Sequence, residues 1–198
     1  MRRTRLAFYA LLLPLVVVVT GCSTSRNTRM SRSYQSLVTR YNVYFNGNEA
    51  YKKGYLAQEK AKKDNLLEIL DLYPISDEKV RSTGKSDFDL AIEKSQKAVK
   101  LHSISVKPEI KKGTLTESEK AFYNKNEYNP FLWHAWILMA DAQRQNGDFI
   151  EAASTYSYIT KLYYDEPEIV AEAQYKMAQC YSEMVYGQQQ RSVLWGRA

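Results

Sequence analysis

Residues 129–187 place hydrophobic side chains at the spacing of one helix face, in three successive segments. Asn129-Pro130 favours the start of a helix, and Gly147 favours the left-handed position that ends it. Asp148-x-x-Glu151 has the spacing of a capping box for a return helix, and a third helix is predicted to begin near Pro167. The three hydrophobic faces comprise Trp133, Trp136, Ile137 and Ala140; Ala152, Tyr156, Ile159 and Tyr163; and Val170, Ala173, Met177, Ala178 and Tyr181.

This arrangement resembles the tetratricopeptide repeat, a pair of antiparallel helices in which small residues let the backbones approach and aromatic rings fill the space beside them. Three features depart from the usual pattern: Met139-Ala140 replaces Leu-Gly, Gln143 stands where Tyr is usual, and Ala140 and Ala178 are 38 residues apart, whereas the usual period is about 34. The resemblance implies an all-α solenoid of helical hairpins with a protein-binding surface. The residues expected in its core are Trp136, Met139, Ala140, Gly147, Ala152 and Tyr156 in the first repeat, and Ala178 and Tyr181 in the second.

Residues 34–128 also predict helices. Leu37, Val38, Tyr41 and Phe45 recur at helical spacing, and Asn46-Gly47-Asn48 predicts a break after them. A β-hairpin through Asn46-Gly47 is the competing interpretation, because the residues before it are strand-like. The alanines that follow continue a helical face and favour a pair of helices: Ala50, Ala57 and Ala61.

Two loops are expected within this region, at residues 74–86 and 104–115, because both contain proline and glycine. Between them, Ser86 is predicted to cap an amphipathic helix. After the second loop, Thr116-x-x-Glu119 predicts a capping box for a short helix. The inward positions of the longer helix are expected to be Phe88, Ala91, Ile92, Ala98 and Val99.

The N-terminus has the features of a bacterial lipoprotein signal peptide. Residues 1–21 combine a positively charged start with an uncharged run of fourteen residues, which is too short to span a bilayer comfortably. Val19-Thr20-Gly21-Cys22 resembles a lipobox, in which the cysteine receives a diacylglycerol before cleavage in front of it. We therefore predict lipidation of Cys22, with an ordinary signal peptide or signal anchor as the alternative. Ser23 in the next position predicts sorting to the outer membrane. Residues 23–27 lack the acidic run that resembles a surface-export signal, so the protein is predicted to face the periplasm.

Positive charge is concentrated next to this predicted anchor. The formal net charge is +6, but residues 23–63 carry nine Lys or Arg against two acids, whereas residues 64–198 carry sixteen against twenty. Nucleic acid binding fits poorly, because this charge lies beside the anchor and no recognition motif accompanies it. Residues 22–33 are interpreted as a lipidated tether whose arginines either contact anionic headgroups or remain solvated. Residues 188–198 are expected to be a tail that belongs to a truncated repeat.

No catalytic or cofactor-binding pattern stands out in the sequence. His102 and His134 each lack a second ligand three or four residues away, so we expect no metal site. Trp133, His134 and Trp136 could form an aromatic cage, but a repeat core accounts for two tryptophans on one helix. Cys180 lies in an apolar run and is predicted to be a small buried residue. We therefore predict a protein without enzymatic activity or a cofactor.

Three segments, together with the lipobox and the repeat, resemble the N-terminal region of the PorW/SprE lipoproteins of Bacteroidetes: residues 40–50, 91–98 and 129–136. Members of that family are longer and carry many repeats. The resemblance implies an outer-membrane-anchored, periplasmic scaffold of the type IX secretion system, which also serves gliding motility in gliding species. Its expected partners are the PorK/PorN ring and the outer-membrane translocon. A general outer-membrane assembly lipoprotein is the alternative, and a lipid-anchored cell-wall enzyme is a less favoured one.

Overall fold

The computed structural model describes residues 23–195 apart from residues 65–66, 68–72 and 111–112, with side chains described up to Tyr186. The predicted lipidation site, Cys22, lies outside the described residues. Within them, all regular structure is helical, as the sequence predicts. The elements are α2 (Arg29–Val38), the π-helical turn η1 (Thr39–Tyr44), α3 (Phe45–Ala61), the 3-10 turn η2 (Pro74–Ser76), α4 (Glu78–Ser82), α5 (Lys85–His102), α6 (Glu117–Asn124), α7 (Leu132–Asn146), α8 (Phe149–Leu162) and α9 (Pro167–Trp195).

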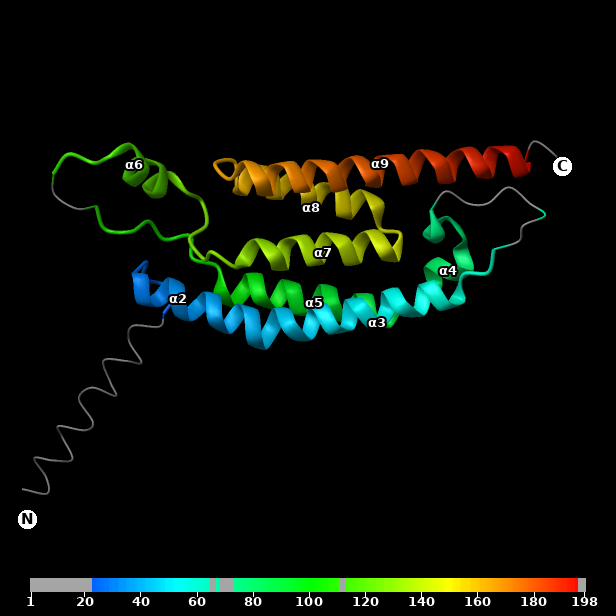
Figure 1. The fold of residues 1–198 in the computed structure, drawn as a ribbon, viewed down its shortest axis with the longest axis horizontal. Helices are drawn as coiled ribbons and strands as arrows, with labels where there is room; N and C mark the ends of the chain where they lie inside the picture. The colour runs from blue at the N-terminus through cyan, green and yellow to red at the C-terminus, as the bar shows by residue number, and fades with distance from the viewer. Residues whose placement is uncertain (1–22, 65–66, 68–72, 111–112, 196–198) are drawn as a thin grey trace, which may run out of the picture.

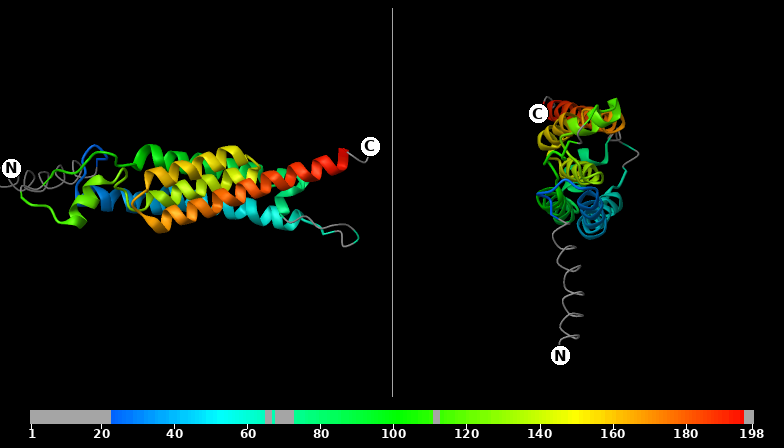
Figure 2. Two further views of the ribbon diagram at one scale, coloured as in Figure 1. Left: turned by 90° about the horizontal axis from the view of Figure 1, so that it is seen from above. Right: turned by 90° about the vertical axis from the view of Figure 1, so that its left-hand side faces the viewer.

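The long helices form one stack in which each runs antiparallel to the one before it (Figure 1). α3 packs on α5, α5 on α7, α7 on α8 and α8 on α9, so neighbours in sequence are neighbours in space. The right-hand view of Figure 2 shows the same succession end-on, with α9 and α3 at opposite sides. One hydrophobic cluster joins the two predicted regions across their boundary and consists of Val43, Ala98, Leu132 and Ala135. The fold is therefore an all-α, repeat-like stack.

The N-terminal helix begins earlier than the sequence predicts. Thr28 caps α2 by accepting a hydrogen bond from the Ser31 amide at 3.1 Å. Ser31 is fully buried, and its hydroxyl donates to the Ser23 carbonyl at 2.6 Å. Residues 22–33 are therefore not a free tether throughout, because capping and burial hold their second half in the stack.

The predicted break at Asn46-Gly47-Asn48 is wrong, and so is the competing β-hairpin. α2 continues through η1 into α3 without interruption. Gly47 lies inside α3, where a Cβ atom would be 3.2 Å from Lys94 Cβ and 3.3 Å from Leu138 Cδ2. Glycine at this position therefore allows α3 to lie close to α5 and α7, and it does not form a turn.

α2 and η1 turn their polar side toward the stack. The buried residues recur every fourth position and comprise Ser31, Gln35, Thr39, Val43 and Gly47. A strict four-residue repeat rotates slowly around an α-helix, which has 3.6 residues per turn. The wider π turn absorbs this excess and keeps the stripe facing α5. The positions that the sequence marked as hydrophobic are exposed in consequence: Leu37 at 58%, Tyr41 at 61% and Phe45 at 54%.

The predicted loop at residues 74–86 contains two short helices, η2 and α4, and α5 begins at Lys85 without a Ser86 cap. Gly84 precedes α5 with a φ of 77°, and a Cβ there would lie 2.7 Å from the Gly54 carbonyl oxygen. This turn is therefore determined by a contact with α3, which local sequence does not reveal. The inward positions predicted for α5 are buried or half-buried: Phe88, Ala91, Ile92, Ala98 and Val99.

Candidate protein-binding surface

The α7–α8 hairpin is built as the sequence predicts. Gly147 ends α7 in the left-handed conformation, with a φ of 85°. Ala140 and Ala152 are fully buried, so the two helices approach closely there. The predicted core residues of this hairpin are buried or, for Trp136, half-buried: Trp136, Met139, Ala140, Ala152 and Tyr156.

The predicted capping box at Asp148 is wrong. The Asp148 side chain makes no capping hydrogen bond, although this residue directly precedes α8. Its backbone amide donates to the Gln143 carbonyl at 2.9 Å, while the Gly147 amide donates to the Arg144 carbonyl at 2.9 Å. Asp148 therefore belongs to the C-terminal cap of α7, and its backbone does not take the extended conformation that an N-cap requires.

Two ion pairs hold α9 against α7. Lys176 donates to Asp141 Oδ2 at 2.6 Å, and the Tyr156 hydroxyl donates to Asp141 Oδ1 at 2.5 Å. Arg144 donates to Glu183 at 2.6 Å, with both side chains largely buried. Burial raises the pKa of Glu183, an effect that Arg144 partly offsets. Sequence reasoning missed these pairs, although charges at the inward positions of amphipathic helices are a signal for them.

The pKa of Arg144, the partner of Glu183, is also shifted. Burial lowers the pKa of Arg144, but Glu183 together with Tyr156, Asp141 and Tyr51 outweighs this effect, and the pKa is raised overall. Arg144 therefore stays charged. Because removing one partner would leave a buried charge uncompensated, the pair holds α9 in one register on α7.

The outward side of α9 is open, which contradicts the predicted core positions of Ala178 and Tyr181. Ala178 is exposed, and Tyr181 is 52% exposed. The residues of α9 that pack toward α8 lie on the other side of the helix and include Ala173 and Cys180, both fully buried. Both sides of α9 carry small and aromatic residues at helical spacing. In the described part of the chain, only the side that faces α8 is covered by other residues.

Exposed aromatic and aliphatic residues occur along α8 and α9, and three of them, Ile150, Tyr158 and Tyr181, line one hollow. We call this set the α8–α9 face; it comprises Ile150, Tyr158, Tyr175, Tyr181 and Val185, which are 48–67% exposed. A hollow of about 450 Å³ lies between the two helices and includes Lys161 and Met184 in its lining. Tyrosine rings offer an apolar body and a hydrogen-bonding tip, and such side chains are enriched at protein interfaces.

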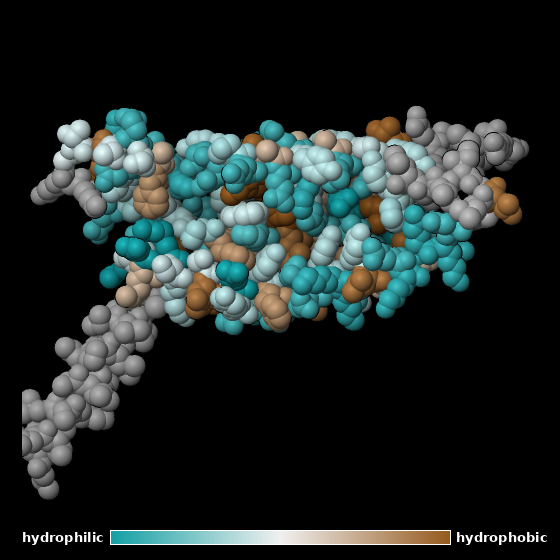
Figure 3. Space-filling view, in the orientation of Figure 1, coloured by the Kyte–Doolittle hydropathy of each residue, from teal (hydrophilic) through white to brown (hydrophobic). Residues whose placement is uncertain are grey.

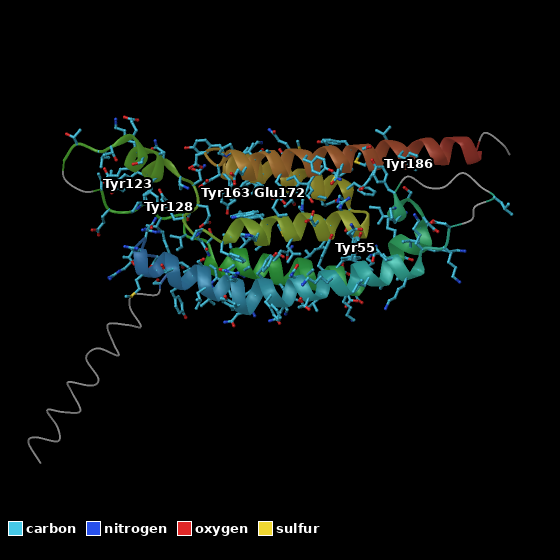
Figure 4. The ribbon with its side chains drawn as sticks, in the orientation of Figure 1. Tyr55, Tyr123, Tyr128, Tyr163, Glu172 and Tyr186 are labelled. Atoms are coloured by element: carbon cyan, nitrogen blue, oxygen red, sulfur yellow. The ribbon has the colours of Figure 1, made fainter. Side chains whose placement is uncertain are left out.

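A second hollow, of about 540 Å³, lies at the end of the stack where α7 begins and the α8–α9 turn passes. Tyr128 and Tyr163 lie at this end (Figure 4). Nearby, Glu127 accepts hydrogen bonds from the backbone amides of Ile104, Tyr128 and Asn129, which fixes the connection between α5 and α7. The hollow therefore has a rigid rim.

The two histidines serve the structure. His102 Nδ1 lies 2.6 Å from Gln35 Oε1, and burial lowers the His102 pKa. His134 is stacked between the rings of Trp133 and Phe131, with centroid separations of 3.6 and 4.2 Å. These close contacts place His134 within a packed aromatic cluster.

Neither a metal site nor a membrane-spanning helix is found in the part of the chain that the structure describes. There, no three His, Cys, Asp or Glu side chains are grouped so that they could hold an ion. No helix among the described residues combines the length and the apolar character that crossing a bilayer requires. Cys180 is fully buried, as predicted, and burial raises its pKa to about 11, so it is held as a neutral thiol.

α9 runs through residues 188–195 as a continuous helix. The helix therefore shows no break at residue 188, where the sequence analysis places the start of a tail. Helix-forming residues such as the glutamines at 188–190 continue the helix without a break.

No protein-family model matches this chain, and no curated protein matches it.

Proposed function

We propose that this chain is a lipid-anchored helical scaffold that binds other proteins through its α8–α9 face. The observation that carries the proposal is the group of half-exposed Tyr, Ile and Val side chains on that face. They sit on helices whose positions are held by the buried pairs Asp141–Lys176 and Arg144–Glu183. A rigid helical stack with an exposed aromatic surface is suited to binding a polypeptide, because little order is lost on association.

The cellular setting we propose is the periplasmic side of the outer membrane, with lipid on Cys22. Support comes from the lipobox around Cys22 and from the resemblance of three segments to PorW/SprE lipoproteins. On that basis we propose a scaffold or adaptor role in type IX secretion, with ring and translocon components as partners, and in gliding where gliding occurs. We also propose that this role is structural and not enzymatic, since the sequence carries no recognisable catalytic motif.

The anchor is tested by replacing Cys22 with serine in the native cell. The Cys22→Ser chain is expected to lose palmitate labelling. Labelling that persists in this variant contradicts lipidation at Cys22.

The binding face is tested by affinity capture of the tagged chain from detergent-solubilised membranes. Recovery of ring or translocon components is the expected result, and it should be lost in the double variant Tyr158→Ser/Tyr181→Ser. The control is Leu56→Ser, a similarly exposed position on α3. Recovery of barrel-assembly components in place of these indicates the alternative assembly role. Equal recovery by the double variant and the control excludes the α8–α9 face.

A further inference from the structure

A second exposed apolar surface lies on the opposite side of the stack. We call it the N-terminal stripe; its members are Met30, Tyr34, Leu37, Tyr41 and Phe45, which are 44–63% exposed. Met30 and Phe45 are separated by roughly 22 Å along the helix, at about 1.5 Å per residue. In Figure 3, separate brown and tan residues appear among teal and pale ones along the lower edge of the molecule, over α2 and α3. A continuous stripe of this length differs from the single exposed hydrophobic residues that are normal on protein surfaces.

The stripe cannot turn inward, because hydrogen bonds fix the other side of the same helix. Gln35 bonds His102 through its side chain. The Asn129 side chain donates to Thr39 Oγ1 at 3.1 Å and to the His102 carbonyl at 2.9 Å. Thr39 and Asn129 are almost completely buried. Rotating α2 to bury the stripe would break this network and leave several buried polar groups without partners, which is costly.

Positive charge exceeds negative charge around the stripe, and the nearest acid in sequence, the exposed Glu49, is paired with Lys52 at 2.9 Å. Residues 23–48 contain four arginines and no acidic residue. Arg29 and Arg40 are both exposed and lie three helical turns apart, so they stand on the same flank of the stripe. The Arg40 guanidinium also lies over the rings of Tyr41 and Phe131, at 5.4 and 5.7 Å from their centroids. An arginine held against aromatic rings in this way can extend its charge to the polar layer above an apolar surface.

We propose that the N-terminal stripe lies in the interface of an anionic lipid bilayer, parallel to the membrane surface. The apolar side chains enter the boundary between headgroups and acyl chains, the tyrosine hydroxyls remain at headgroup level, and the arginines pair with lipid phosphates. This inference goes beyond the proposed function, since it assigns a membrane contact that involves neither Cys22 nor the α8–α9 face. It also orients the scaffold, because the α8–α9 face then points away from the membrane toward protein partners.

The test uses a chain that begins at Ser23 and therefore carries no acyl group. All the described helices and contacts lie within residues 23–195, so this chain contains the whole described fold. Its co-sedimentation is measured with vesicles of phosphatidylethanolamine and phosphatidylglycerol, and with vesicles of phosphatidylcholine alone. We expect binding to the anionic vesicles, which weakens in high salt because the arginine contribution is screened. Failure of this binding leaves the result for Cys22→Ser unaffected, so the two proposals fail separately.

Two double variants assign the contact to a face. Leu37→Ser/Tyr41→Ser is expected to lower the partition coefficient about tenfold or more, as the loss of two interfacial apolar side chains implies. Val185→Ser/Tyr175→Ser is the matched control on α9, where both residues are similarly exposed, and should bind as the parent chain does. Equal losses in the two variants, or no vesicle binding by the parent chain, overturn the proposal.

A position-specific probe gives a readout that does not depend on weakened binding. The chain from Ser23 contains one cysteine, Cys180, which is fully buried, so Leu37→Cys and Tyr175→Cys can each be labelled selectively with a polarity-sensitive fluorophore. The probe at position 37 should shift to the blue on anionic vesicles, whereas the probe at position 175 should not. A blue shift at position 37 that instead grows with protein concentration in the absence of lipid indicates a second copy of the chain as the occupant and refutes the lipid assignment.

Discussion

Replacing Tyr156 with phenylalanine removes one hydroxyl from the point where α7, α8 and α9 meet. Tyr156 is fully buried and its hydroxyl donates to Asp141 Oδ1 at 2.5 Å, while Asp141 Oδ2 accepts from Lys176 at 2.6 Å. Burial, followed by the charge of Asp141, raises the pKa of Tyr156, so the hydroxyl remains a donor throughout the neutral pH range. The hydroxyl therefore couples the α7–α8 hairpin to the ion pair that holds α9.

The expected cost follows from the bond that is lost. A hydrogen bond to a charged group contributes about 1.5–3 kcal/mol, and the ring itself stays in place, so the cavity term is small. We expect Tyr156→Phe to lower the free energy of unfolding by that amount. For a chain of this size, the midpoint of thermal unfolding should fall by about 3–12 °C. Urea titration followed by circular dichroism measures the first quantity, and a thermal scan measures the second.

The control is Tyr158→Phe, on the same helix two residues later, where the side chain is 48% exposed. This change should alter stability by less than about 0.5 kcal/mol. A double-mutant cycle of Tyr156→Phe with Lys176→Met should show a coupling free energy above about 0.5 kcal/mol, because both residues contact Asp141. The reasoning is refuted if Tyr156→Phe is as mild as the control, or if the two changes are additive.

Two further predictions concern the first half of the stack. Gly84→Ala should destabilise the chain by about 1–3 kcal/mol from its positive φ. It should cost more than Gly147→Ala, because the φ angles are similar, 77° and 85°, but the added Cβ meets the Gly54 backbone at position 84 and only the Arg81 side chain at position 147. Equal costs in urea titrations would show that the contact with Gly54 is unimportant. Burial lowers the pKa of His102 from 6.5, so the unfolded chain binds more protons and the stability contribution is present above pH 6.5 and lost as pH falls below it. The stability lost between pH 7.5 and 5.5 should therefore be smaller in His102→Gln, and an unchanged slope would contradict this assignment.

Features determined by short stretches of sequence could be predicted well. The capping box of Thr116 and Glu119 forms with both of its hydrogen bonds, because the two residues that make it are three positions apart. Gly147 takes the left-handed conformation expected of a helix end. The buried positions of α5 and of the α7–α8 hairpin also follow from helical spacing, since one face of each helix must be shielded from water.

Features that depend on distant neighbours could not be predicted in this way. Gly47 was expected to break a helix, but the approach of Lys94 and Leu138 shows that it permits close packing inside one. The exposed surfaces were misassigned for a related reason. On α2, Gln35 and Thr39 face inward because His102 and Asn129 satisfy their hydrogen bonds, and these partners lie far away in the sequence.

By itself, the sequence determined that the chain is helical, where most of the longer helices lie and which residues fill the α7–α8 hairpin. These properties depend on periodicity and on local hydrogen bonds, which act within a few residues. α2 and α9 each have two sides that could be buried, and only the tertiary structure decided which one is. The choice depends on which side chains of the neighbouring helix are available to pack against it or to form hydrogen bonds with it. The ion pairs at Asp141 and Arg144, and the two exposed faces proposed here for proteins and for lipid, follow from that choice.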